Sequence, residues 1–377
     1  MWQLAFRQII HDRVRSGLTV LAICAAVAVI LVLRGFEQGL YAQSEKVVLD
    51  RGGQLILVQA GISNFMAVRS SIPQLTRADV EAVAGVKEAH PVTSFWVIYG
   101  PEGNKFPLLL LVYDTLGGPP HIVDGSGIKD GRDVVIDLGL AKRFDLQPGD
   151  PLVISEFEFR IAGITSDSSA LFSTFAYVSY DGLIDFLIES EVAPDISTFP
   201  LVSFLLVELE QGADPASIAE AIENEVKAVD VFTPQHLAQK DRQLGEELFG
   251  PIMNVLILLS YVIGMLVIGL IIYSDVSMRR RDFSVMKALG FRPGHIAHSV
   301  LVQTSILVVL AFPLGIGLAY LVASLIEWQM PVYFVHVLDE AGLWKTLLGL
   351  LAMALVSGLL PLRLVSRADP VAAFQVE

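Results

Sequence analysis

The residues from Asp124 to Asp133 have types and spacing that could bind calcium, because acidic residues alternate there with glycines and a serine. A calcium loop needs an oxygen ligand at its fifth position and a glutamate at its last. The sequence has Ile128 and Val135 at these two positions. We therefore interpret the segment as an acidic turn and predict no calcium site.

Two groups of histidines could ligate a transition metal. His295 and His298 stand three residues apart, so they would share one face of a helix, and His336 is followed by Asp339 and Glu340. A zinc ion needs three or four protein ligands, and the sequence around His295 and His298 offers no third. We predict no metal site in either group.

Motifs that carry catalytic chemistry in other proteins are absent. The sequence contains no G-x-x-x-x-G-K-[ST] phosphate loop and no G-x-S-x-G nucleophile motif. Its single cysteine, Cys24, lies in an apolar run, which excludes an intrachain disulfide and a cysteine-based metal site. We predict a chain that is not an enzyme and holds no cofactor of its own.

The composition excludes a plain water-soluble protein. Apolar residues make up 53% of the 377 residues, charged residues only 18%, and the mean hydropathy is +0.59. A globule of this size could not cover its surface with so few charges, so part of the chain must face lipid. The formal net charge of −14 argues against a nucleic-acid partner.

Four apolar segments are long enough to cross a bilayer, whose hydrocarbon core of about 30 Å needs roughly 20 helical residues. The first ends without a small-residue cleavage motif, which favours a retained anchor over a signal peptide. Before it, residues 1–15 have apolar side chains at helical spacing, as in a short helix lying in the membrane interface. The spans are predicted at residues 16–33, 248–274, 295–326 and 346–362.

The charge distribution predicts the orientation. Of the eleven Lys and Arg residues outside the polar region, residues 34–247, ten lie in short segments beside the spans. Positive charge in short loops marks the cytoplasmic side. Residues 1–15, 275–294 and 363–377 are therefore predicted to be cytoplasmic, and the polar region and residues 327–345 to lie outside. The polar region holds 15 basic and 32 acidic residues, so it carries almost all of the acidity.

The polar region has the patterning of a mixed α+β domain of one lobe or two. Its last helix begins after Thr233-Pro234 and meets no break signal before the second span, so one helix would link the outer domain to the membrane. Shorter helices are predicted from a Thr76–Asp79 capping box to near Gly85, at 138–144, and from Asp214-Pro215. Strands are predicted at 54–59, 89–99, 106–112, 133–136, 152–154, 157–164, 201–209 and 229–232.

The segment between the second and third spans combines a basic cluster with an apolar stripe. Phe283, Met286 and Leu289 recur at helical spacing, and three consecutive arginines precede them. Gly290 can close this helix in a left-handed conformation. The apolar stripe needs a surface to cover, either the lipid headgroups or a groove on a partner protein.

These residues resemble a known family. Residues 279–296, which read R-R-R-D-F-S-V-M-K-A-L-G-F-R-P-G-H-I, resemble the cytoplasmic loop of the FtsX/MacB-type ABC transporter permeases. The opening segment Leu4–Ile10 with Arg15, and the closing segment Leu360–Phe374, are similar to the ends of that family. Four spans with one large exported domain between the first and second are also the family's plan.

The resemblance implies a fold class: a membrane α-helical protein with four transmembrane helices and an extracytoplasmic α+β domain between helices 1 and 2. It also implies a dimer of permeases, each resting on a separate cytoplasmic ATPase that binds ATP and magnesium. The helix at 279–289 would be the coupling helix, and ATP-driven motion would reach the exported domain through stalk helices. The expected ATPase contacts are Arg279, Arg280, Arg281, Asp282, Met286, Lys287, Leu289, Gly290 and Phe291.

Gly35 and Gly39 form a small-xxx-small pair at the outer end of the first span. Such pairs let helices approach closely, so the two glycines are candidates for packing in the dimer. Ordinary membrane-helix composition explains them equally well.

The function implied is that of a permease subunit in the bacterial cytoplasmic (inner) membrane, with both termini cytoplasmic. It would couple a partner's ATP hydrolysis to export or extraction of a hydrophobic or amphiphilic cargo. Further partners would be a second permease copy or paralogue, the lipid membrane and a membrane-fusion or adaptor protein, with no nucleic acid. One alternative is an FtsX-like signalling scaffold that activates an exported enzyme without transport. Another is a membrane-anchored enzyme with its site in the exported domain.

Overall fold

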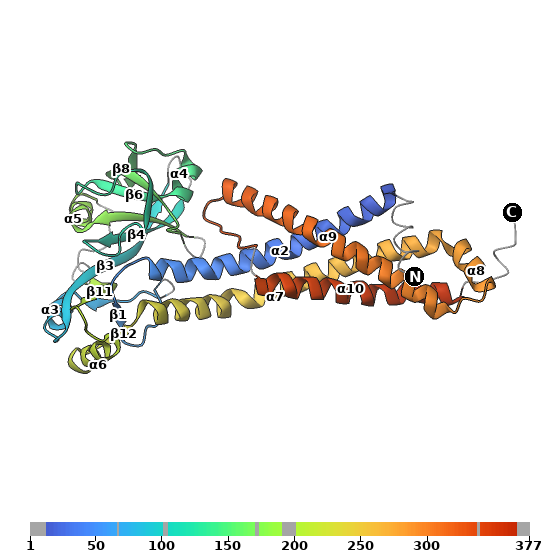
Figure 1. The fold of residues 1–377 in the computed structure, drawn as a ribbon. Coiled ribbons are helices and arrows are strands. Elements are labelled where there is room, and N and C mark those ends of the chain that lie inside the picture. Colours follow the sequence, from blue (N-terminus) through green and yellow to red (C-terminus); the bar gives the residue numbers. More distant parts are fainter. Residues whose placement is uncertain are drawn as a thin grey trace. The chain divides into compact units, whose positions relative to one another are not determined.

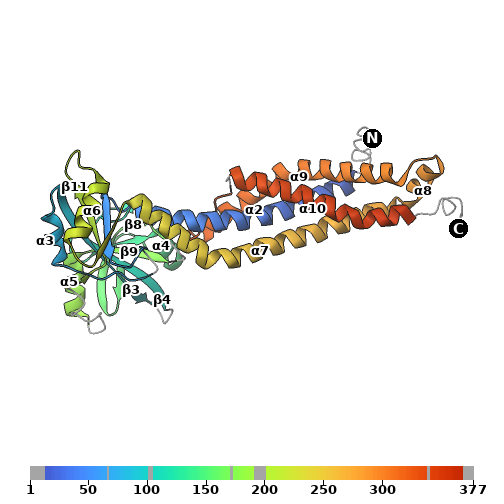
Figure 2. The ribbon, with the colours of Figure 1, turned by 90° about the horizontal axis from the view of Figure 1, so that it is seen from below.

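The chain forms two compact units in a computed structural model, which describes residues 13–65, 68–100, 105–169, 173–190, 201–337 and 340–367. The helical unit contains the residues up to Gln38, Gly250–Ile326 and the residues from Val335 on. The strand-rich unit contains Gly39–Phe249 and Glu327–Phe334. Figures 1 and 2 draw the chain from two sides.

Long helices dominate the helical unit: α2 (Arg13–Leu49), α7 (Pro234–Met278), α9 (Pro293–Gln329) and α10 (Glu340–Arg367). All four run lengthwise through the unit, and α9 crosses α2 in the view of Figure 1 (Figures 1 and 2). Parts of α2, α7 and α9 are long and apolar enough to cross a membrane, whereas the apolar stretch described in α10, Gly342–Ser357, is shorter. By length and composition, three of the four predicted spans lie in helices that could cross a membrane. That all four segments are spans stays a prediction.

These helices are apolar both where they pack against one another and on their outer surface. Ile30, Val308 and Leu350 are fully buried where the helices meet. On the outside, Leu266 of α7 is 64% exposed and Leu321 of α9 is 59% exposed. A helix that is apolar all round suits a lipid environment, because water would penalise such a surface.

Two of the long helices run from one unit into the other without a break. The division between the units falls at Gln38/Gly39 inside α2 and at Phe249/Gly250 inside α7. This continuity confirms the prediction that the helix after Thr233-Pro234 extends into the second span. α7 contains Pro251, which has no N–H and cannot donate the helical hydrogen bond to the preceding turn.

A mixed ten-stranded sheet forms the strand-rich unit, in the order β12-β1-β11-β3-β4-β9-β6-β8-β5, with β7 pairing β3 and β8. β4/β9 and β6/β8 are parallel pairs and the others are antiparallel. A separate two-stranded sheet joins β2 and β10. The strands are β1 (Leu55–Gln59), β2 (Ile72–Pro73), β3 (Val86–Tyr99), β4 (Phe106–Tyr113), β5 (His121–Gly125), β6 (Asp133–Asp137), β7 (Pro151–Ile154), β8 (Phe157–Ser166), β9 (Thr174–Ser179), β10 (Leu201–Val202), β11 (Phe204–Leu209) and β12 (Val229–Phe232).

Short helices cover the two ends of this sheet. α4 (Leu138–Phe144) and α5 (Tyr180–Glu189) bury Leu140 and Phe186 at the β6/β8 end, and α6 (Pro215–Glu225) buries Ile222 at the β12 end with α3 (Thr76–Glu81). The polar region was predicted to form one lobe or two. One continuous sheet links its two ends.

The predicted cap of α6 is confirmed and that of α3 is wrong. The Asp214 carboxylate accepts a hydrogen bond from the backbone N–H of Ser217 at 3.0 Å, and Pro215 is the first residue of α6. α3 instead has Leu75 before its first residue, with no side-chain hydrogen bond to cap it, so Thr76 lies inside the helix.

Asp137 carries a carboxyl group that should make the stability of the strand-rich unit depend on pH. It precedes α4, is 2% exposed, and accepts hydrogen bonds from Gly139 N at 2.7 Å and Ser168 Oγ at 2.6 Å. Burial raises its pKa from 3.8 to about 6.

Between about pH 4 and pH 6 the folded chain therefore holds a proton that the unfolded chain has lost. Protonated Asp137 therefore contributes to the free energy of unfolding. This contribution, about 3 kcal/mol in all, is fully present below pH 4 and is lost as the pH rises through 6. Asp137→Asn, which cannot ionise, is expected to flatten this dependence. Thermal unfolding of the full chain at pH 4.5 and pH 7 measures the effect, and equal pH slopes for the two proteins would contradict it.

Candidate functional site

The predicted amphipathic helix is present as α8 (Arg280–Ala288), between the end of α7 at Met278 and the start of α9 at Pro293. Leu289 follows it, and Gly290 has a φ of +89°, the left-handed conformation that the sequence predicted. Gly290 N donates to Lys287 O at 2.9 Å and Phe291 N donates to Met286 O at 3.1 Å. These bonds satisfy the last carbonyls of α8 and turn the chain sharply towards α9.

The apolar stripe of α8 divides between two directions. Phe283 is 7% exposed and packs into the core of the helical unit, and Met286 packs partly against the same core. Leu289 is 72% exposed, Phe291 40% and Val285 42%. Phe283 and Met286 therefore attach α8 to its own chain, and the other three side chains form an outward apolar surface, which we call the α8 surface.

The charged residues at α8 also divide. Arg279 pairs with Asp275 one turn earlier at 3.3 Å, and the two side chains are only 16% and 19% exposed. Both line a pocket inside the helical unit together with Gln303 and Thr304. Arg279 therefore faces this pocket, whereas Arg281 is exposed. The ATPase contact expected of Arg279 stays a prediction.

The other four predicted ATPase contacts are Lys287, Gly290, Arg280 and Asp282. Lys287 is half-buried and Gly290 is exposed. The backbones of Arg280 and Asp282 belong to α8, but their side chains lie outside the part of the chain that the structure describes.

The two glycines considered for dimer packing are buried within the single chain. The carbonyl of Gly35 accepts a hydrogen bond from His336 N at 2.8 Å. A Cβ on Gly35 would come within 3.1 Å of the His336 backbone and the Val335 side chain. Gly35 therefore lets the segment after α9 pack against α2, and its small size serves a contact inside the chain.

A buried arginine holds the end of α2 in the strand-rich unit. Arg51 is 1% exposed and donates hydrogen bonds from Nε to Val47 O at 2.8 Å, from Nη1 to Gly117 O at 3.0 Å and from Nη2 to the Tyr177 hydroxyl at 3.1 Å. Its guanidinium also lies 5.9 Å from the centre of the Phe175 ring. α2 is thereby attached to the loop after β4 and to β9, which no motif in the sequence indicated.

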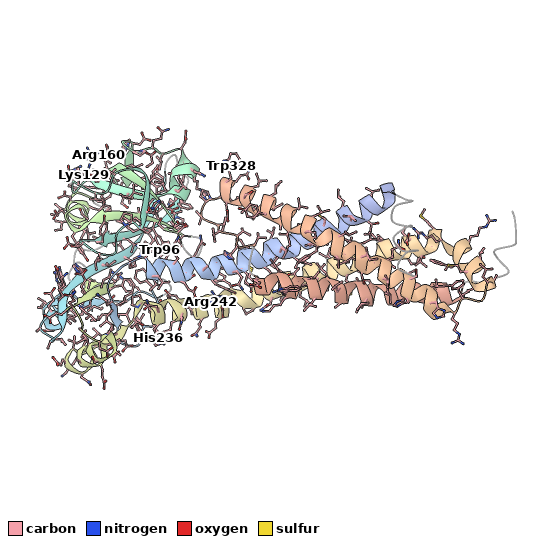
Figure 3. The ribbon with its side chains drawn as sticks, in the orientation of Figure 1. Trp96, Lys129, Arg160, His236, Arg242 and Trp328 are labelled. Carbon is pink, nitrogen blue, oxygen red and sulfur yellow. The ribbon has the colours of Figure 1, made fainter. Side chains whose placement is uncertain are left out.

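The beginning of α7 is attached to the same unit by a second set of contacts. Both oxygens of Asp241 accept the backbone N–H of Phe65, at 3.0 and 3.1 Å. Arg242 of α7, labelled in Figure 3, lies 3.5 Å from Glu45 of α2. The two long helices are therefore joined to each other and to the sheet at this end.

Comparison with known proteins gives two family matches that together cover most of the chain. The MacB-like periplasmic core domain matches residues 16–225, and the FtsX-like permease C-terminal domain matches residues 254–370. An uncharacterized ABC transporter permease of Mycobacterium tuberculosis is 24% identical over 98% of both chains. A probable syringafactin export ATP-binding/permease protein of Pseudomonas syringae pv. tomato is 23% identical over 99% of this chain and 58% of its own length.

Two solved structures match this chain at low similarity. The extracellular domain of the noncanonic ABC-type transporter YknZ from Gram-positive bacteria covers 48% of this chain and 100% of its own, with a TM-score of 0.35 and 12% identity. The periplasmic region of MacB from Actinobacillus actinomycetemcomitans covers 51% and 94%, with a TM-score of 0.36 and 14% identity. The family matches confirm the resemblance that the sequence indicated.

Proposed function

Because this chain belongs to the FtsX/MacB-type family of ABC transporter permeases, we propose that it couples ATP hydrolysis by a separate cytoplasmic ATPase to motion of its strand-rich unit. The observation that carries the proposal is the continuity of α2 and α7, each of which belongs to both units. A helix without a break can carry a displacement along its length, whereas a flexible linker would absorb it.

The ATPase would bind at the α8 surface. Leu289, Phe291 and Val285 project outward beside the exposed Arg281, so apolar contact is combined with positive charge. An amphipathic helix that places one face in a partner's groove is a common mode of recognition. Phe283 fixes α8 to the helical unit, so a push on the α8 surface would reach α7 and α9 directly.

Motion would leave the helical unit through the two attached helix ends. Arg51 ties α2 to the sheet and Asp241 ties α7 to the loop at Phe65. Among the described residues of the long helices, Ser260 and Thr304 donate to carbonyls of their own helices, and Arg279 is paired with Asp275. This favours mechanotransmission over passage of a polar cargo between the helices.

We further propose that α10 is the fourth span, that a second copy or a paralogue completes the transporter, and that it acts in the bacterial inner membrane. The basic segments 1–15, 275–294 and 363–377 would be cytoplasmic. ATP and magnesium would be bound by the ATPase. A membrane-fusion or adaptor protein is a further partner of the same scheme.

The cargo would be hydrophobic or amphiphilic, and the strand-rich unit would export or extract it at the outer face of the membrane. A related protein named for probable syringafactin export supports an export role. The second candidate is an FtsX-like scaffold that activates an exported enzyme without transport, which the family match at residues 254–370 favours.

Membrane vesicles of both orientations test the ATPase partner and the orientation together. The full chain is placed in inside-out and in right-side-out vesicles, and a candidate cytoplasmic ABC ATPase is added with ATP and magnesium. We expect binding and faster phosphate release only with inside-out vesicles, because only these expose the α8 surface. Equal results for the two orientations, or no binding to either, would refute the proposal.

The same vesicles distinguish the two functions. Candidate lipids and peptides are added in one series and a candidate cell-wall hydrolase in another, each from the side of the strand-rich unit. Faster ATP hydrolysis with a lipid or a peptide supports transport. Acceleration by the hydrolase alone supports the scaffold.

A further inference from the structure

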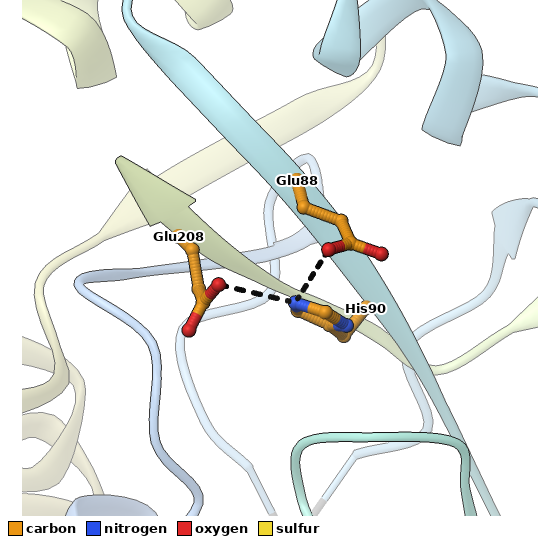
Figure 4. A group of neighbouring side chains, drawn as sticks. All are labelled: Glu88, His90 and Glu208. Carbon is orange, nitrogen blue, oxygen red and sulfur yellow. Dashed lines mark ion pairs between the residues drawn. The ribbon is translucent and has the colours of Figure 1, made fainter. Parts of the chain in front are cut away.

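A buried histidine stands between two glutamates on neighbouring strands of the central sheet. Glu88 and His90 belong to β3, and Glu208 of β11 is paired directly opposite Glu88. His90 Nε2 lies 3.9 Å from Glu88 Oε2 and 3.8 Å from Glu208 Oε2 (Figure 4). One donor atom from each of the three side chains lies within 4.8 Å of the others.

A bulge in the pairing produces this arrangement. Leu209 pairs with Val86 and Glu208 with Glu88, so Lys87 is an extra residue on β3. Residues 88 and 90 lie on one face of β3 because side chains alternate along a strand. Two carboxylates directly opposite each other repel unless a positive charge lies between them.

His90 is the observation that points to a ligand. Its side chain is 2% exposed, and both ring nitrogens are buried without a hydrogen-bond partner. Buried polar atoms are almost always paired, since an unpaired one loses its hydration without compensation. The distances of 3.8 and 3.9 Å are too long for direct hydrogen bonds to the two glutamates.

We propose that Glu88, His90 and Glu208 bind a divalent cation of the zinc type. One imidazole and two carboxylates are a donor set that zinc accepts, with a water molecule as the fourth ligand. Donors at about 2.0–2.2 Å around a tetrahedral ion lie roughly 3.4 Å apart. Each glutamate oxygen therefore needs to move roughly half an ångström closer to His90 Nε2, and the two glutamate oxygens, which lie within 4.8 Å of each other, need to approach by up to about 1.4 Å. The ion would balance both carboxylates and pair with the free His90 nitrogen.

Two basic side chains contact the glutamates of the site, and only one of them would compete with the cation. Arg77 lies 3.6 Å from Glu88 Oε1, the oxygen that does not face His90, so it can stay when the cation binds. Lys87 Nζ lies 2.9 Å from Glu208 Oε2, the oxygen that does face His90. Lys87 keeps the pKa of Glu208 below its usual range, and its side chain is 61% exposed and can swing away. Removing Lys87 should therefore strengthen binding of the cation.

The site would join the two strands at the bulge. β3 pairs with β11 on one side and β4 on the other, so it lies near the middle of the sheet. A cation held by both strands would fix their register where the pairing is irregular. Glu88 is 47% exposed and Glu208 31% exposed, so solvent can reach the two carboxylates.

Zinc chloride titrated into the full chain in detergent, after removal of metal with a chelator, tests the proposal. We expect one zinc ion per chain by equilibrium dialysis with elemental analysis. Glu208→Gln, which preserves shape, should weaken binding by more than about 100-fold, beyond the loss usual for outer-shell partners. Lys87→Met should tighten binding. His236→Ala, which removes an exposed histidine outside the site, should leave it unchanged.

Cobalt can be bound in place of zinc, and a cobalt ion in a tetrahedral site absorbs visible light strongly. This absorption reports on the site itself and does not depend on the stability of the chain. His90→Gln should abolish this absorption, and circular dichroism of the same sample establishes that the variant is folded. The absence of zinc binding by the natural sequence would overturn the proposal. So would unchanged binding by both His90→Gln and Glu208→Gln, because the ion would then be held elsewhere in the chain.

Discussion

Arg51→Ala is expected to lower the free energy of unfolding of the strand-rich unit by about 3 kcal/mol, or the unfolding midpoint by roughly 6–12 °C. The substitution leaves Gly117 O and the Tyr177 hydroxyl without their donor and opens a cavity among rings. The cost of burying the guanidinium opposes part of this loss, so the estimate is below the largest values known for buried charges. Thermal unfolding of the full chain, followed by intrinsic fluorescence, gives the shift.

Arg132→Ala is the matched control. Arg132 donates two hydrogen bonds from Nη2 to the carboxylate oxygens of Glu189, at 2.6 and 2.8 Å, but the two side chains are 50% and 49% exposed. Exposed pairs contribute at most about 1 kcal/mol, so this variant should unfold close to the natural sequence. If Arg51→Ala unfolded as the control does, the attachment of α2 by Arg51 would not be a major source of stability.

The second large effect is expected from Leu289→Asp, which rests on the proposed ATPase contact. Leu289 is 72% exposed in the chain, so it must lose its water when a partner covers it. A carboxylate in its place would be desolvated without a partner charge, and we expect ATPase binding to weaken by about 100-fold. Co-purification of the ATPase with the tagged chain, followed by a binding titration, measures the loss.

Leu289→Met serves as the control for this substitution, because methionine keeps the volume and the apolar character. It should bind the ATPase as the natural sequence does, and both variants should unfold at the same temperature. Met286 and Phe283 are unsuitable test positions, since they pack against the helical core and a charge there would destabilise the chain itself. Normal ATPase binding by Leu289→Asp would remove the α8 surface from the proposal.

The elements that could be predicted are those whose signals are local. The left-handed Gly290 follows from the end of an apolar stripe, and β4 and β6 follow from apolar runs. β9, the buried strand between them, was missed. β5 was missed, because it is an edge strand whose residues are mostly exposed and lack apolar alternation. It overlaps the start of the segment interpreted as an acidic turn. α5, whose Ser179 cap accepts from Gly182 N at 3.1 Å, was also missed.

Of the candidate sites too, only the locally encoded parts could be predicted from the sequence. The position of α8 could be predicted, but the inward direction of Arg279 depends on Asp275 one turn earlier, an i,i+4 pair that the sequence contained. Arg51 and His90 could not be found, because what makes them notable is burial. His90 meets Glu208 only through the register set by the bulge at Lys87. Neither the register nor the bulge can be read from one strand's sequence alone.

The proline in α7 makes the two connecting helices mechanically unequal. α2 has no proline between Arg13 and Leu49, whereas Pro251 interrupts the hydrogen bonding of α7 next to Gly250, where one unit gives way to the other. A rod loaded at its ends bends first at its weakest turn. Under the proposed coupling, α7 would bend more readily at Pro251 than α2 does at the same boundary, because α2 keeps all of its backbone N–H groups there.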